Sequence, residues 1–300
     1  MMKNLVLAAI AAIAIAAPAR ADLSVFACEP EWGALATEIG GAKVSVYNAT
    51  TGRQDPHQIQ ARPSLIAKAR AADIAVCTGA ELEVGWMPMV VQQSANSKLG
   101  DPATGLFEAT SFVSLAEQPS RLDRSEGDIH AAGNPHIQTD PRNILSVANA
   151  LTQRFTALDA ANAAFYQGRL ADFTARWKAA LARWDAIAVT LKGVPIAVQH
   201  LSWIYLERWT GMKRVVALEP KPGVPASSGY LAEVLGKLQS SPVKVIIRAA
   251  YEDDRSSTFV AGRANVPAIV LPFTVGGTDE AKDLFSLYDD TLGRLKAAVK

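Results

Sequence analysis

The sequence has few of the residues that define several common classes of protein. Two cysteines are too few for a disulfide scaffold or a four-thiolate zinc site. The 30 basic and 29 acidic residues balance, which argues against nucleic acid or an anionic membrane surface as a partner. Gly-x-Ser-x-Gly, His-Glu-x-x-His and glycine-rich phosphate motifs of enzymes are missing. With 49% hydrophobic residues in 300, the chain is predicted to fold, with room for two domains.

The N-terminus predicts export. One lysine precedes an unbroken apolar run from Leu5 to Ala17, and Pro-Ala-Arg-Ala follows it. This is the pattern of a cleavable signal peptide over residues 1–21, cut after Ala21. The run is shorter than the roughly 20 apolar residues of a membrane span. We therefore expect no membrane span and an exported protein, most simply a periplasmic one.

Short β-branched runs alternate with helical patterns in two blocks, which is typical of parallel sheets. Strands are predicted at 23–28, 44–47, 74–77 and 112–115, and again at 194–199, 215–218, 243–247 and 268–271. Between the blocks lies a segment rich in Ala, Leu and Arg, whose later part predicts one long helix. The expected fold is α/β, with two lobes joined by that helix and a cleft between them. The expected boundaries are 22–159 for the first lobe, 160–191 for the linking helix and 192–300 for the second lobe.

Three of the four histidines lie at predicted junctions between strands and helices. His57 follows the second strand, His136 precedes a helix, and His200 ends the fifth strand. Ligands of open α/β sheets bind beyond the carboxyl ends of the strands, so all three can face one cleft. Zinc accepts three histidines and one carboxylate. Three acidic residues after the last strand are candidates for that carboxylate, and spacing alone does not select among them: Asp279, Glu280 and Asp283.

Five motifs resemble those of the zinc- and manganese-specific periplasmic solute-binding proteins of ABC transporters, over essentially the whole mature chain. They are Pro56-His57 with Pro63-Ser64, Asn134 to Pro141 around His136, His200 with Trp203 and Tyr205, Gly79 to Trp86, and Glu219-Pro220. Gln138 and Leu201 depart from the family pattern at positions that are not ligands.

The resemblance implies a non-enzymatic, monomeric protein that binds Zn²⁺ and delivers it to the membrane permease of an ABC importer. A periplasmic metallochaperone is a second candidate partner. The implied ligands are His57, His136, His200 and Asp279. Manganese-type members use a carboxylate at the third position, so a histidine there favours zinc. The long helix is expected to act as a stiff hinge.

Zinc-binding members of the family often carry a histidine-rich loop before the second ligand. Residues 116–133 occupy that place here but hold only His130. We interpret this stretch as a mobile, solvated connection.

Two other functions use the same residues. A zinc hydrolase would keep three histidine ligands and an open water position. A metal-binding adhesin or chaperone-like protein is the other alternative. Four closed protein ligands would indicate capture and delivery, whereas three would allow hydrolysis.

Cys28 and Cys77 are predicted to form a disulfide. Each ends a strand, and in the common strand order 2-1-3 these two strands are neighbours, about 4.8 Å apart. That spacing and an oxidising compartment favour the bond. A pair of free buried thiols and thiolate ligation of the metal are the alternatives.

Overall fold

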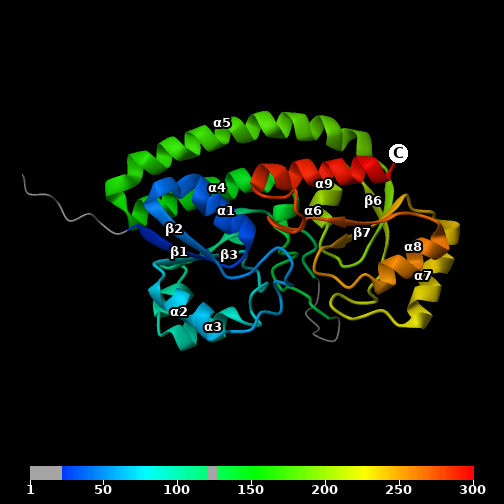
Figure 1. The fold of residues 1–300 in the computed structure, drawn as a ribbon, viewed down its shortest axis with the longest axis horizontal. Coiled ribbons are helices and arrows are strands. Elements are labelled where there is room, and N and C mark those ends of the chain that lie inside the picture. Colours follow the sequence, from blue (N-terminus) through cyan, green and yellow to red (C-terminus); the bar gives the residue numbers. More distant parts are fainter. Residues whose placement is uncertain (1–21, 120–126) are drawn as a thin grey trace, which may run out of the picture.

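The computed structural model describes residues 22–119 and 127–300, so the signal peptide and its cut after Ala21 lie outside the described residues. Two four-stranded sheets, each parallel throughout, form two lobes (Figure 1). The first has the order β2-β1-β3-β4 and the second the order β6-β5-β7-β8. The strands are β1 (Leu23–Ala27), β2 (Val44–Asn48), β3 (Ile74–Cys77), β4 (Leu106–Glu108), β5 (Pro195–Val198), β6 (Lys213–Ala217), β7 (Val245–Ala249) and β8 (Ala268–Leu271).

Helices cover both faces of the sheets, which explains why a central strand such as β3 is buried at all four residues. Proline occupies the first or second position of four helices, where its missing N–H costs no hydrogen bond. The helices are α1 (Pro30–Gly40), α2 (Pro63–Ala71), α3 (Met87–Ser94), α4 (Pro141–Leu158), α5 (Ala163–Ala188), α6 (Ile204–Thr210), α7 (Ser228–Ser240), α8 (Arg255–Ala264) and α9 (Leu284–Ala298). None of the helices described is long and apolar enough to cross a membrane.

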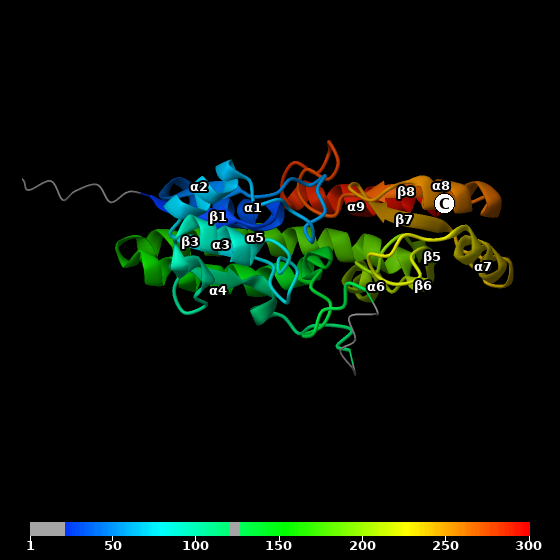
Figure 2. The same ribbon diagram turned by 90° about the horizontal axis from the view of Figure 1, so that it is seen from below.

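The long helix α5 lies along both lobes, with α4 and α9 beneath it (Figures 1 and 2). Its inner face buries Phe173, Trp177 and Trp184. The indole N–H of Trp177 donates to the Pro141 carbonyl at 2.9 Å, and that of Trp184 donates to Asp289 at 2.6 Å. These indoles fasten α5 to the start of α4 and to α9.

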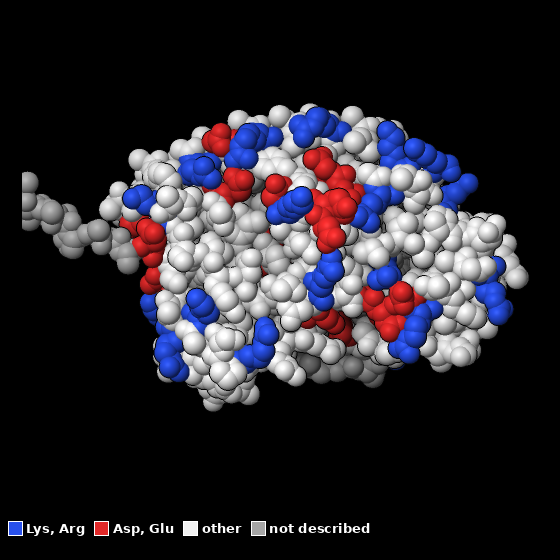
Figure 3. Space-filling view, viewed as in Figure 1, with Lys and Arg blue, Asp and Glu red and all other residues white. Residues whose placement is uncertain are grey.

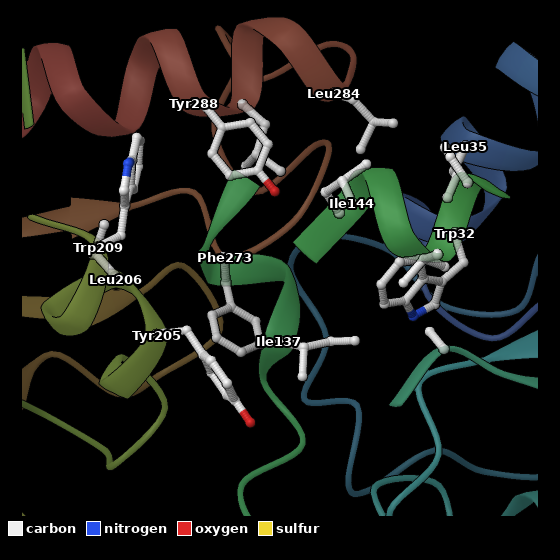
Figure 4. Packing of buried hydrophobic residues seen from close by; sticks show 14 of the residues in the cluster. Trp32, Leu35, Ile137, Ile144, Tyr205, Leu206, Trp209, Phe273, Leu284 and Tyr288 are labelled. Atoms are coloured by element: carbon white, nitrogen blue, oxygen red, sulfur yellow. The ribbon is translucent and has the colours of Figure 1, made fainter. Parts of the chain in front are cut away.

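One hydrophobic core runs through both lobes (Figure 4). It extends from Trp32 and Leu35 of α1, through Ile144 of α4, to Tyr288 of α9 and Trp209 of α6. Because these side chains belong to one cluster, the two lobes share part of their hydrophobic core.

The prediction of a strand at residues 112–115 was wrong. The fourth strand is β4, which pairs with β3 through Leu106, Phe107 and Glu108. The chain then makes a 3₁₀ turn, and Phe112 stacks on Phe107 with the ring centres 5.0 Å apart. The apolar residues that follow pack on the core from a loop, so their hydrophobicity reflects burial without strand pairing.

The predicted neighbourhood of β1 and β3 is confirmed. The structure joins Cys28 and Cys77 in a disulfide, with their Cα atoms 4.7 Å apart. Both residues are buried at the carboxyl ends of these strands.

Three carboxyl groups are buried beside this disulfide. Glu83 accepts hydrogen bonds from the backbone N–H groups of Thr78, at 2.7 Å, and Gly79, at 3.1 Å. Glu29 accepts from the Thr78 hydroxyl at 3.1 Å. Glu31 hydrogen-bonds Thr274 of the second lobe. Burial raises the pKa of Glu83 and of Glu31 to about 7, and the pKa of Glu29 rises with them.

We expect these groups to make stability fall as pH rises. A carboxyl group whose pKa is raised on folding binds more protons in the folded state, so stability is lost between about pH 4.5 and 7. The slope is about 1.4 kcal/mol per pH unit for each proton. Buried histidines whose pKa is lowered make stability rise with pH, which opposes the effect of the carboxyl groups. The contribution of Glu83 is therefore measured as the difference in free energy of unfolding between the wild type and Glu83→Gln. Urea unfolding of metal-free protein should show the variant gaining about 2 kcal/mol relative to the wild type between pH 5 and 8. A difference that does not change with pH would contradict this assignment.

Candidate metal centre

Three histidines from distant parts of the chain meet in the cleft between the lobes. His57 lies in the loop after β2, His136 precedes the 3₁₀ turn that leads into α4, and His200 follows β5. One ring nitrogen from each lies within 4.8 Å of the others. The ring centres are 5.5 Å apart for His57 and His136, 5.9 Å for His57 and His200, and 6.0 Å for His136 and His200.

Carboxylates orient two of these rings. Nδ1 of His57 is 2.8 Å from Asp55, and Nδ1 of His200 is 2.7 Å from Glu219. A hydrogen bond on Nδ1 fixes the ring and leaves Nε2 as the free lone pair. Within the described part of the chain, Nε2 of His57 is buried without a hydrogen-bond partner. This is the arrangement of an imidazole prepared to bind a metal ion.

His136 is the most buried of the three, at 1% exposure. Its ring and that of Phe273 meet at a steep angle, with the centres 5.2 Å apart, and its backbone N–H donates to the Asn134 side chain. Burial, followed by the charges of the neighbouring histidines, lowers the pKa of His136 well below its usual value. His136 therefore stays neutral, as a metal ligand must.

The pKa of His200 moves the other way. Burial works to lower it, but the hydrogen bond and the charge of Glu219 outweigh burial, and the pKa rises. Burial raises the pKa of the neighbouring Glu252 to about 7. The second lobe thus presents a basic imidazole backed by acidic groups, which favours binding of a cation.

The structure does not bring Asp279 to the histidines. Its side chain is 88% exposed and pairs with Arg53 at 2.7 Å. The other two candidates are also occupied elsewhere. Glu280 pairs with Arg294 at 2.7 Å, and Asp283 caps the start of α9. A tight turn after β8, closed by the bond from the Gly276 N–H to the Ala281 carbonyl, carries this acidic stretch away from the cleft.

Three groups beside the histidines were not predicted to act at the site: His130, Asp55 and Glu252. The ring of His130 lies 5.5 Å from that of His57 and 6.1 Å from that of His136. The interpretation of residues 116–133 as a solvated connection was therefore wrong for its last part; residues 120–126 lie outside those described. The available signal was that His130 is the remaining histidine and precedes the Asn134-Pro135-His136 motif.

Glu219→Gln should weaken metal binding. The amide can still bond Nδ1 of His200 but carries no charge, so the imidazole becomes less basic. Loss of such an orienting carboxylate typically costs 10–100-fold in metal affinity. A competition titration with a zinc chelator measures the change, and Glu280→Gln, on an exposed loop, is the matched control. Unchanged affinity in Glu219→Gln would exclude this role.

On the face seen in Figure 3, basic and acidic side chains are interspersed. A cleft of about 710 Å³ opens beside the site and is lined from both lobes, by His57 and Asp55 on one side and by His200, Glu219 and Glu252 on the other. The arrangement of imidazoles backed by carboxylates suits a small cation.

Comparisons with known proteins identify a family, relatives and solved structures that this chain resembles. Residues 25–298 match the family model described as ZnuA, zinc-uptake complex component A, periplasmic. The manganese ABC transporter substrate-binding lipoprotein PsaA of Streptococcus anginosus is 22% identical over 261 residues, 85% of this chain and 81% of the relative. The metal ABC transporter substrate-binding lipoprotein FimA of Streptococcus parasanguinis is 22% identical over 250 residues, 80% of this chain and 76% of the relative.

Solved structures show the same fold. A crystal structure of ZnuA superposes with a TM-score of 0.77 and 19% identity, over 93% of this chain and all of that chain. The manganese-bound periplasmic metal-binding protein of Candidatus Liberibacter asiaticus gives a TM-score of 0.75 and 17% identity, over 93% and 100% of the two chains. The family model spans nearly the whole chain, and the chain therefore belongs to the ZnuA family of metal-binding solute-binding proteins of ABC transporters, which are not enzymes.

Proposed function

We propose that this protein captures Zn²⁺ in the periplasm and delivers it to the membrane permease of an ABC importer. The observation that carries the proposal is the set of three converging imidazoles of His57, His136 and His200. We propose these three residues as ligands. We further propose that the protein acts as a monomer and is loaded by a periplasmic metallochaperone. We place the lobes at 22–159 and 192–300 and the helix that joins them at 160–191.

The choice of zinc over manganese follows from ligand chemistry. Manganese prefers oxygen ligands, whereas imidazole suits zinc and other borderline metals. In this chain His200 provides a nitrogen, and its carboxylate neighbour Glu219 bonds the ring from behind. Several relatives are named for manganese, but at about 22% identity their ligand types need not be shared.

Metal analysis with competitive titration tests the proposal. Protein purified from the periplasm should contain one zinc per chain. Excess Mn²⁺ should not displace that zinc, because all three proposed ligands are nitrogens. Retention of manganese, or preferential binding of it from an equimolar mixture, would contradict the zinc assignment while leaving metal binding itself intact.

A further inference from the structure

His130 takes part in the same cluster of rings as the three proposed ligands. It completes a set in which all four histidines of the chain converge, although they are separated by up to 143 residues between His57 and His200. Such convergence has a cost, because burying several imidazoles together without partners leaves polar nitrogens unsatisfied. A shared ligand would satisfy them.

The ring spacings are slightly wider than those of a tetrahedral zinc site. With Zn–N bonds of about 2.1 Å, four imidazoles around one zinc place their ring centres roughly 5 Å apart. The five measured pairs of rings in this cluster lie between 5.5 and 6.1 Å. One ring nitrogen from each of His57, His136 and His200 already lies within 4.8 Å of the others, so the ring of His130 would have to move toward these three to complete a tetrahedral set.

The nitrogen of His130 that would bind is available. In the described part of the chain, Nε2 of His130 is buried and has no hydrogen-bond partner. The ring also hydrogen-bonds the backbone of Ala80. A bond on one ring nitrogen with the other left free is the pattern already seen for His57.

Contacts on both sides hold the segment that carries His130 over the cleft. On the first lobe, the Ala131 N–H donates to Glu81 at 3.0 Å. On the second lobe, the Asp128 N–H donates to the Pro222 carbonyl at 3.0 Å, and Asn134 donates to the Leu201 carbonyl at 2.9 Å. His130 is thus placed by contacts to both lobes, close to the boundary where the other three rings meet.

The carboxylates near the cluster already have other contacts. Asp55 and Glu219 bond the back of His57 and His200, and Glu252 accepts from the Ala249 N–H at 2.7 Å. The chain leaving β8 presents an apolar side chain, Phe273, to His136. The acidic groups therefore surround the cluster and offset the charge of a cation from a second layer.

We propose that His130 is the fourth protein ligand, so that Zn²⁺ is held by four imidazoles. This inference rests on the proposed function and deepens it, because it assigns the residue that closes the site. A site with four nitrogen donors discriminates against oxygen-preferring cations more strongly than one with three nitrogens and a carboxylate.

X-ray absorption of the zinc-loaded protein and zinc release to a chelator test the inference. Wild type should show four imidazole donors, and His130→Ala three imidazoles with one oxygen donor. Zinc release should be at least about 10-fold faster in His130→Ala, because loss of a ligand exceeds the effect of losing a group behind one. Glu81→Gln, which weakens the contact to Ala131 but keeps the imidazole, should retain four imidazole donors.

The possible results distinguish the role of His130 from zinc capture itself. A wild type with three imidazole donors, or a His130→Ala variant with unchanged coordination and release, overturns the inference and leaves zinc capture standing. A wild type that binds no zinc overturns the proposed function and the inference together. Four imidazole donors in the wild type and three in His130→Ala support both.

Discussion

Replacing His136 with alanine will lower zinc affinity by about 100-fold or more. His136 is buried between the other rings, and its replacement removes a nitrogen donor at a place where water enters poorly. Because burial keeps this imidazole neutral, its lone pair is available at neutral pH without displacing a proton. Isothermal titration in competition with a chelator of known affinity measures the loss.

The same experiment applies to His57→Ala and His200→Ala, which we expect to show losses of similar size. Asp279→Ala is the matched control, because this exposed carboxylate pairs with Arg53 outside the cluster and should not change affinity. Circular dichroism checks that each variant folds. Wild-type affinity in two of the three histidine variants would refute the ligand assignment. A large loss of affinity in Asp279→Ala would show that Asp279 contributes to metal binding.

Removing the disulfide will destabilise the first lobe by about 2–4 kcal/mol. The bond links residues 49 apart in the chain, and closing such a loop lowers the entropy of the unfolded state. The double variant Cys28→Ala/Cys77→Ala avoids leaving a single free thiol. Denaturant unfolding of the metal-free protein, followed through the buried tryptophans, gives the difference in free energy of unfolding.

Two measurements check that the effect comes from the bond. The intact mass of the unreduced protein should be lower by two hydrogens than after reduction. The double variant should keep zinc affinity near that of the wild type, since the cysteines lie at the carboxyl ends of β1 and β3 and are not among the proposed ligands. Two alkylatable thiols in protein from the periplasm would show that the bond does not form there.

Local sequence pattern was sufficient for most of the architecture. Alternation of β-branched runs with amphipathic stretches predicted seven of the eight strands near their observed places. Short buried strands read as continuous apolar runs, whereas helices buried on one face repeat their apolar residues every three to four positions. The order of β2, β1 and β3 followed from the common topology of parallel sheets, and it places Cys28 next to Cys77. The meeting of His57 and His200 followed from a related rule, because each follows the carboxyl end of a strand in its own sheet and ligands of open α/β sheets bind beyond those ends.

Only the tertiary structure decided where the connecting segments lie. The sequence placed Asp279 and His130 in loops, and nothing in their neighbours along the chain determines which loop reaches the cleft. Asp279 is turned outward to Arg53, 226 positions earlier, whereas the His130 segment is held inward by Glu81 and Pro222. These partners are remote in sequence, so no local pattern along the chain determines these contacts. The side chains that complete the cluster were therefore set by packing between distant loops rather than by any local pattern.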